Sequence, residues 1–268
     1  MNNKVIIALA PTGGWGAGRN NPVTPEDIAE DVIACAAEGA AVLHVHCRDR
    51  AGQLTDDMSF FNETLGLIKD RTEIILEAST GGLSALSAAQ RVLPVTSTHA
   101  EMGSLNVGSL NFGDYVYQNS LPDVRFWLEE MKRQGVKPSL EVFDTGHLET
   151  ALNLISDGLV PEPCNFSFIF NVQWGMSYDR RLLSYLVSRL PAGSCWGAIF
   201  IGSIDFSAHL EASDMGAAIV RVGFEDSLDY NGRTAASNVE LVSTLRRELE
   251  QQGYKILGPE EARLRLLS

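Results

Sequence analysis

The sequence predicts an α/β fold, a single (β/α)₈ TIM barrel that spans residues 1–268. Three observations favour it. The 268 residues match the length typical of such barrels. Short apolar runs alternate with helical segments along the whole chain, and no linker or change of composition divides it. This alternation is typical of a parallel sheet wrapped by helices, with a doubly wound open sheet as the structural alternative.

The strands are predicted from runs of β-branched and apolar residues that are too short for buried helices. The run at 5–10 reads VIIALA and the run at 41–46 reads AVLHVH, and the run at 100–105 is the weakest of the set. We expect strands at 5–10, 41–46, 73–79, 100–105, 139–143, 166–170, 196–201 and 218–223.

Each predicted strand is followed by a predicted helix. The first helix carries the clearest end signals. Thr24 is a plausible N-cap, Pro25 occupies the first helical position, Asp27 completes a capping-box pattern and Gly39 follows the last turn. We expect helices at 24–38, 60–71, 87–93, 122–134, 148–156, 180–189, 206–215 and 237–252.

Composition and charge restrict the classes of function. The formal net charge of −13 disfavours nucleic acid and anionic membranes as partners. Hydrophobic residues make up 45%, so we expect no long disordered region. The four cysteines form no CxxC pair, which favours free thiols in a reducing cytoplasm. An acidic protein that binds an anionic substrate needs a local positive centre, such as a metal ion or a buried arginine.

The second predicted strand ends in His44-Val45-His46. Alternate residues of a strand point to the same side, so the two imidazoles can converge on one metal ion at the end of the barrel where such active sites lie. Two unrelated histidines at a strand end are the alternative.

The eighth predicted strand carries Arg221 and is followed by Glu225 and Asp226. A buried guanidinium needs a carboxylate partner, and Asp226 is the natural candidate. Glu225 could then complete a His₂Glu set of metal ligands with one open position. Alternatively, both acids lie on a solvated loop.

Other polar residues lie at or near strand ends. Ser79 and Gly82 belong to a Ser-Thr-Gly-Gly turn, whose backbone N–H groups could bind an oxyanion. Ser104 and Asn106 end the fourth strand, and Glu141 lies within the fifth. The glycines after the first strand do not match GxGxxG, so we do not expect a dinucleotide site.

Almost the whole chain resembles the β-keto acid cleavage enzymes, typified by 3-keto-5-aminohexanoate cleavage enzyme. The HxHxR segment and the RxGxED segment, in this order and at this separation, are the most specific elements of the resemblance. It also includes the segments at 10–14, 24–26, 39–46, 79–82, 104–106, 110–113, 140–143 and 237–238.

The resemblance implies a zinc-dependent barrel, commonly a homotetramer, that converts a β-keto acid and acetyl-CoA into acetoacetate and a new acyl-CoA. It implies one Zn²⁺ per subunit and acetyl-CoA as co-substrate. The metal ligands it implies are His44, His46 and Glu225. Asp226 matches the general base, Arg221 matches the partner of that base, and the Ser79 turn could stabilise oxyanions. The implied substrate pocket contains Ser79, Gly82, Ser104, Asn106 and Glu141.

The chain departs from the aminohexanoate-cleaving member near the first strand. The place of an acidic residue that would bind the substrate amine is held by Trp15 or by the adjacent Gly14, and no carboxylate lies between Thr12 and Thr24. Trp15 favours a neutral or apolar substrate tail, although a tryptophan also binds quaternary ammonium groups. Arg19 in the same loop could instead pair with a second carboxylate. Ser139 and the 171–174 segment also differ from relatives.

Two other functions remain open. A barrel hydrolase of the amidohydrolase type also begins with HxH, but it needs further histidines near strands five and six. The remaining histidines are His99, His147 and His209, none of which ends strand six. We expect His209 on a helix surface and the other two in structural roles. A non-enzymatic binding module would leave the polar strand ends without a purpose.

Overall fold

A computed structural model describes residues 3–14, 20–82, 85–203 and 205–268. Eight parallel strands form a closed barrel, because the first and last of them also pair with each other. The barrel strands are β1 (Lys4–Leu9), β2 (Ala40–Val45), β3 (Ile75–Ser79), β4 (Met102–Asn106), β7 (Lys137–Val142), β8 (Asn165–Phe170), β9 (Cys195–Phe200) and β10 (Ile219–Val222). The predicted fold class is therefore confirmed.

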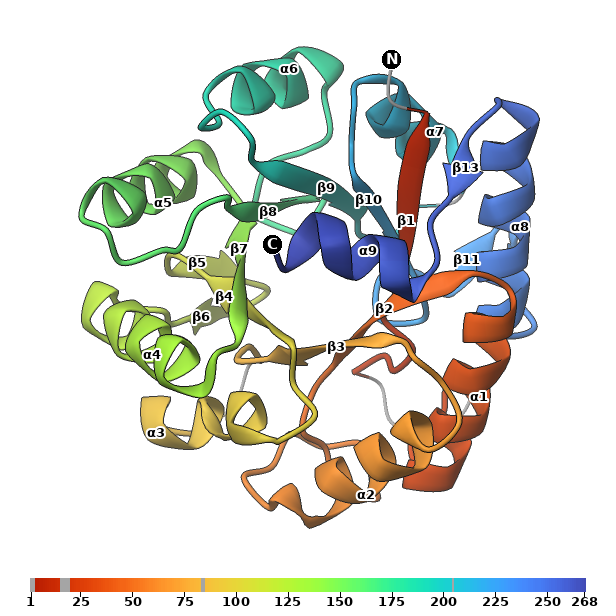
Figure 1. The fold of residues 1–268 in the computed structure, drawn as a ribbon, viewed down its shortest axis with the longest axis horizontal. Coiled ribbons are helices and arrows are strands. Elements are labelled where there is room, and N and C mark those ends of the chain that lie inside the picture. Colours follow the sequence, from red (N-terminus) through yellow and green to blue (C-terminus); the bar gives the residue numbers. More distant parts are fainter. Residues whose placement is uncertain (1–2, 15–19, 83–84, 204) are drawn as a thin grey trace.

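Helices surround the barrel on the outside (Figure 1). They are α1 (Pro25–Ala37), α2 (Met58–Lys69), α3 (Ala88–Arg91), α4 (Leu121–Gln134), α5 (Thr145–Ser156), α6 (Arg180–Ser188), α7 (Ser207–Asp214) and α8 (Asn238–Gln251). Thr24 caps α1 as expected, since its side chain accepts a hydrogen bond from the Asp27 N–H. A 3₁₀ turn, η1 (Leu93–Thr96), follows α3.

The alternation of strand residues separates two apolar layers. Residues that point outward, such as Leu43 and Leu76, pack against the helices in the main core. Residues that point inward near the start of the strands, such as Ile6 and Val42, form a second cluster inside the barrel. The outer layer thus holds the helices, and the inner layer fills the half of the barrel where the strands begin.

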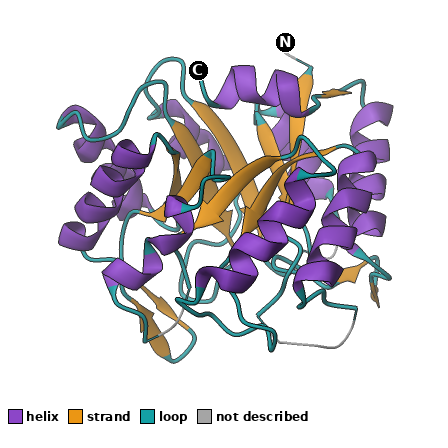
Figure 2. Cartoon of the chain, turned by 60° about the horizontal axis from the view of Figure 1, so that its bottom comes forward, coloured by secondary structure: helices purple, strands orange, loops and turns teal. Residues whose placement is uncertain are grey.

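A C-terminal helix that was not predicted from the sequence closes the barrel at the end where the strands begin. α9 (Pro259–Leu266) lies across the N-terminal end of the barrel (Figures 1 and 2). Its residues Ala262 and Leu266 join the inner cluster with Leu257. The helix has only eight residues, and its two buried side chains, Ala262 and Leu266, face the barrel.

Several short strands were also missed. They are β5 (Leu110–Phe112), β6 (Tyr115–Tyr117), β11 (Asp229–Tyr230), β12 (Arg233–Thr234) and β13 (Lys255–Ile256). Runs of two or three residues carry too little periodicity to predict a strand. The β5–β6 hairpin projects from the end of the barrel opposite α9 (Figure 2), so it lies on the face where a barrel active site belongs.

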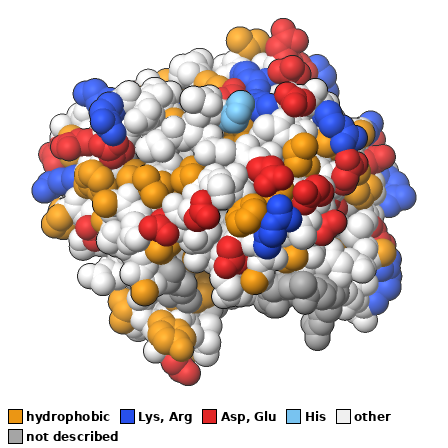
Figure 3. Space-filling model, turned by 90° about the horizontal axis from the view of Figure 1, so that it is seen from below, with side chains coloured by type: hydrophobic (Ala, Val, Ile, Leu, Met, Phe, Trp, Pro, Cys, Tyr) orange, Lys and Arg blue, Asp and Glu red, His pale blue; other side chains and the backbone are white. Residues whose placement is uncertain are grey.

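The described helices include none that is long and apolar enough to cross a membrane. On the face shown in Figure 3, acidic side chains are interspersed with basic ones and do not leave a continuous basic patch.

Candidate active site

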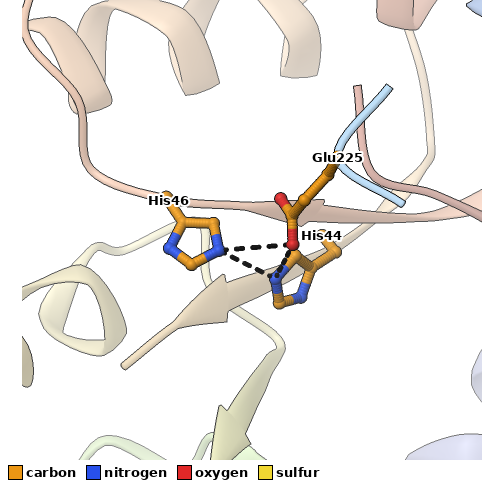
Figure 4. A group of neighbouring side chains, drawn as sticks. All are labelled: His44, His46 and Glu225. Atoms are coloured by element: carbon orange, nitrogen blue, oxygen red, sulfur yellow. Dashed lines mark hydrogen bonds and ion pairs between the residues drawn. The ribbon is translucent and has the colours of Figure 1, made fainter. Parts of the chain in front are cut away.

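Three potential metal ligands converge at the C-terminal end of the barrel. His44 and His46 extend from β2, and Glu225 reaches them from the turn after β10 (Figure 4). The two Nε2 atoms are 3.3 Å apart, and each lies 3.4 Å from Glu225 Oε1. Tetrahedral zinc with bonds of about 2.1 Å holds its ligand atoms roughly 3.4 Å apart. The donor set and its spacing therefore fit one such ion.

The other ring nitrogens fix how the two imidazoles face this point. His44 Nδ1 lies 2.9 Å from Glu77 Oε2, and His46 Nδ1 lies 3.1 Å from the Gly81 carbonyl oxygen. Both partners accept hydrogen bonds, so each Nδ1 carries a proton, and each Nε2, which faces Glu225, would offer a lone pair to a bound metal ion. Hydrogen-bonded partners of this kind commonly orient histidines that bind metals.

The pKa shifts of His44, His46 and Glu225 indicate that a positive charge between their side chains is favourable. Burial lowers the pKa of His44, but Glu225 and Glu77 outweigh it and raise the pKa to about 10. Burial lowers the pKa of His46. Burial also opposes ionisation of Glu225, yet His46, His44 and Arg221 hold its pKa well below the usual range. Without a metal, a proton on His44 supplies the charge that a bound cation would replace.

The turn that carries Glu225 is held tightly against the end of β1. The Glu225 N–H donates to the Ala10 carbonyl oxygen at 3.1 Å. Gly223 has a φ of 144°, and a Cβ at this residue would lie 2.1 Å from the same oxygen. Only glycine fits this close approach of two chain segments.

Arg221 and Asp226 form a buried ion pair beside the cluster. Arg221 Nε donates to Asp226 Oδ2 at 3.0 Å, and Arg221 Nη2 donates to the other oxygen. Nη2 also lies 3.3 Å from Glu225 Oε1. Burial raises the pKa of Asp226, although the Arg221 guanidinium opposes this effect. A carboxylate with a raised pKa is a stronger base, and the acids do not lie on a solvated loop.

The expectation of free backbone donors in the Ser79–Gly82 turn is wrong. The Gly81 N–H donates to Ser79 Oγ at 3.1 Å, and the Gly82 N–H donates to the Tyr117 hydroxyl oxygen at 3.0 Å. Tyr117 comes from the β5–β6 hairpin, so a distant segment satisfies the turn. Ser79 Oγ also accepts from Ser104 Oγ at 3.3 Å, which leaves the Ser79 hydroxyl proton available to a substrate oxygen.

Asn106 and Glu141 lie side by side at the ends of neighbouring barrel strands. Asn106 Nδ2 is buried without a hydrogen-bond partner in the described residues. Glu141 pairs in register with Asn106 across β4 and β7, and burial raises its pKa to about 7. Trp15 and Arg19 lie outside the described residues. Ser139 is buried deeper in the barrel, 3.2 Å from Ser167 Oγ.

His209 does not lie on a helix surface as expected. It is 3% exposed and packs against Phe200 and Phe206, with Nε2 3.1 Å from the Arg221 carbonyl oxygen. Burial lowers its pKa to about 4. The face of α7 that carries His209 packs against β9 and β10. His147 is buried, as expected of a structural histidine, with Nε2 3.3 Å from the Ser109 carbonyl oxygen.

Sequence reasoning also missed residues at this end of the barrel. Glu77 faces His44 across β2 and β3, and its place two residues before Ser79 on the same strand face was the available signal. Thr12 Oγ1 and Arg48 Nε are buried without partners in the described chain. Arg48 lies two residues beyond His46, and that spacing could have suggested that it points the same way.

Comparison with known proteins gives the family context of this site. A family model described as beta-keto acid cleavage enzyme matches residues 4–267. A 3-keto-5-aminohexanoate cleavage enzyme of Fusobacterium nucleatum is 34% identical and covers 98% of this chain and 97% of its own length. A 3-dehydrocarnitine:acetyl-CoA trimethylamine transferase of Rhizobium meliloti is 32% identical, with 99% and 97% covered. A 3-oxoadipate:acetyl-CoA acetyltransferase of Cupriavidus necator is 30% identical, with 98% and 94% covered.

Solved structures support the fold. A ternary complex of ObcA with a C4-CoA adduct and oxalate aligns with a TM-score of 0.78 at 22% identity. The alignment covers 92% of this chain and 67% of the ObcA chain. The family match does not favour the hydrolase of the amidohydrolase type.

Proposed function

Because the chain belongs to the β-keto acid cleavage enzyme family, a family of C–C-cleaving acyl-transfer enzymes, we propose that it converts a β-keto acid and acetyl-CoA into acetoacetate and a new acyl-CoA. The bond between C2 and C3 of the β-keto acid breaks. The acyl group moves to coenzyme A, and the acetyl group of acetyl-CoA joins the remaining two carbons. No oxidant or reductant is needed.

The convergence of His44 Nε2, His46 Nε2 and Glu225 Oε1 carries this proposal, with spacings of 3.3 to 3.4 Å. We assign these residues as the ligands of one zinc ion. A divalent ion held there would supply a Lewis acid that stabilises the negative charge developing on the substrate oxygens. It would also give this acidic protein the local positive centre that an anionic substrate needs.

We assign Asp226 as the general base that removes a C2 proton from the β-keto acid. Its burial favours this role because a desolvated carboxylate holds a proton more strongly. Arg221 donates to both carboxylate oxygens and so fixes their direction.

The hydrogen-bond donors left without partners are suited to bind the substrate. Asn106 Nδ2, Thr12 Oγ1 and Arg48 Nε are buried and unpaired in the described chain. The Ser79 hydroxyl accepts from Gly81 and Ser104, and no acceptor for its own proton is found among the described residues. Buried donors of this kind cost free energy unless a ligand pairs with them. We assign Ser79 and Asn106 to substrate oxygens, and Arg48 to an anionic group of the substrate. Gly82, Ser104, Glu141 and Trp15 complete the proposed pocket.

A substrate panel tests the reaction. The relatives are named for substrates with amine, trimethylammonium and carboxylate tails, so the panel contains 3-keto-5-aminohexanoate, 3-dehydrocarnitine, 3-oxoadipate and the uncharged 3-oxohexanoate. We expect acetoacetate and the matching acyl-CoA from at least one member, only with acetyl-CoA present and not after the metal is removed. Absence of acetoacetate from the metal-loaded protein with all four, or hydrolysis without coenzyme A, would refute the proposal.

Metal analysis and light scattering test two further parts of the proposal. We expect one zinc ion per subunit and a homotetramer in solution. A different stoichiometry or a monomer would correct the respective assignment without changing the reaction.

A further inference from the structure

A fully buried asparagine connects the Glu225 turn to three other segments. Asn238, the first residue of α8, has no exposed surface. Its Oδ1 accepts from the Phe224 N–H at 2.8 Å. Its Nδ2 donates to the Pro11 carbonyl oxygen at 2.9 Å and to Asp31 Oδ2 at 2.7 Å. The side chain therefore joins the end of β1, helix α1, helix α8 and the residue that precedes Glu225.

The neighbours of Asn238 fix the direction of its amide. Pro11 O and the Asp31 carboxylate both require donors, so Nδ2 must face them and Oδ1 must face the Phe224 N–H. Asp31 forms no ion pair within 4 Å among the described residues, and burial raises its pKa to about 6 while the bond from Asn238 lowers it. A partly buried carboxylate without a cation is costly, so its presence points to a role in orienting the amide.

We infer that Asn238, held by Asp31, is a positioning residue that sets the place of Glu225 and Asp226 relative to His44 and His46. The Phe224 N–H is the backbone group immediately before Glu225, whose own N–H is bound to the Ala10 carbonyl oxygen. Two successive amides of the turn are thus tied to fixed points at the end of β1, one directly and one through Asn238. The inference rests on the proposed roles of Glu225 and Asp226.

An exchange of side chains tests the inference. Asn238→Asp keeps the acceptor for Phe224 but loses both donor bonds and places a second carboxylate beside Asp31. We expect the Kd of the metal-stripped protein for Zn²⁺, measured by competition with a chromophoric chelator, to rise at least about tenfold, in line with other residues that support metal ligands. The kcat should fall, and the KM for acetyl-CoA should stay near the wild-type value.

The double variant Asn238→Asp/Asp31→Asn separates positioning from a general loss of stability. It swaps the two side chains, so the new amide on α1 can donate to the new carboxylate on α8, and the hydrogen bond between the two helices returns in the reversed direction. The bond to the Pro11 carbonyl oxygen stays lost, because a carboxylate cannot donate to it, so part of the Zn²⁺ affinity and of kcat should return. Asn165→Ala is the matched control, because this buried asparagine ties β8 to α9 at the far end of the barrel. It should lower Tm and leave the Kd for Zn²⁺ unchanged.

Two outcomes would overturn the inference. One is a double variant that binds Zn²⁺ no better than Asn238→Asp. The other is an Asn238→Asp protein that loses only Tm, as the control does. If Asn238→Asp does not fold, the milder variant Asp31→Asn tests the inference instead. It removes the carboxylate that orients the Asn238 amide, so Zn²⁺ binding should weaken several-fold. Unchanged Zn²⁺ binding would count against the inference. Failure of the wild type to form acetoacetate would refute the proposed function and leave the metal measurements to decide this point.

Discussion

The two ends of the barrel use the same strands for opposite purposes. Near the start of the strands, the inward side chains are apolar, as in Ile6, Val42 and Ile75, and α9 seals them from solvent. Two residues further along β2 and β3, the inward side chains are His44 and Glu77. On each of these strands, the inward side chain thus changes from an apolar core residue to a polar residue of the site over two positions.

The two ends of the barrel therefore contribute differently to folding and to catalysis. The sealed end gains free energy from apolar burial, which costs nothing in unsatisfied polar groups. The open end holds buried charges that are paired with each other, together with the unpaired donors of Thr12, Arg48 and Asn106. Buried polar groups of this kind contribute little to folding and are retained where function needs them. Changes at the two ends should therefore have different consequences.

The largest effect is expected from His46→Ala, which removes one ligand from the open end. A site left with one histidine and one carboxylate should lose its metal, and acetoacetate formation should fall below detection. Metal content by elemental analysis measures the change. His99→Ala, before the start of β4, is the control and should retain the ion. Full metal occupancy in His46→Ala would contradict the ligand assignment.

Asp226→Asn should leave the metal in place and remove the base. The amide keeps a hydrogen bond from Arg221 but cannot take a proton, so we expect kcat to fall about a thousandfold, within the range typical of a general base. Steady-state kinetics together with metal analysis measure the two effects. A kcat close to the wild-type value would exclude Asp226 as the base.

Leu266→Ala, at the sealed end, should lower stability and leave catalysis unchanged. This buried side chain of α9 fills the barrel interior, and its truncation should lower the free energy of unfolding by about 3 kcal/mol. The kcat at 25 °C should not change. Leu264→Ala on the same helix, where the side chain is 73% exposed, should have almost no effect in the same denaturant titration. Equal destabilisation by both would show that α9 does not seal the barrel.

The smallest effect concerns Glu141 and pH. Burial raises its pKa from 4.5 to about 7. In the metal-free protein, the protonated group therefore stabilises the folded state over the unfolded state. This contribution to the free energy of unfolding is lost as the pH rises through the folded pKa. Between pH 5 and 7 the metal-free wild type should lose about 2 kcal/mol relative to Glu141→Gln. Denaturant titrations of both proteins after metal removal measure this. Parallel pH profiles would show that Glu141 is ionised throughout.

The barrel and part of the site could be predicted before any coordinates were known. Strand and helix periodicity are local properties, so the alternating elements could be predicted from neighbouring residues alone. The same local rule predicts that His44 and His46 point to one side of β2. The spacing of Arg221 and Asp226 was likewise short enough to suggest their ion pair, which the structure contains.

Contacts between groups on separate elements could not be predicted in this way, because they depend on how the elements pack. The register of β2 against β3 brings Glu77 to His44, and the β5–β6 hairpin brings Tyr117 to the Gly82 N–H. The burial of His209 and the three hydrogen bonds of the Asn238 side chain have the same origin. Each depends on the packing of segments far apart in the chain, where a one-residue change of register or a small rotation of a helix would replace one partner with another.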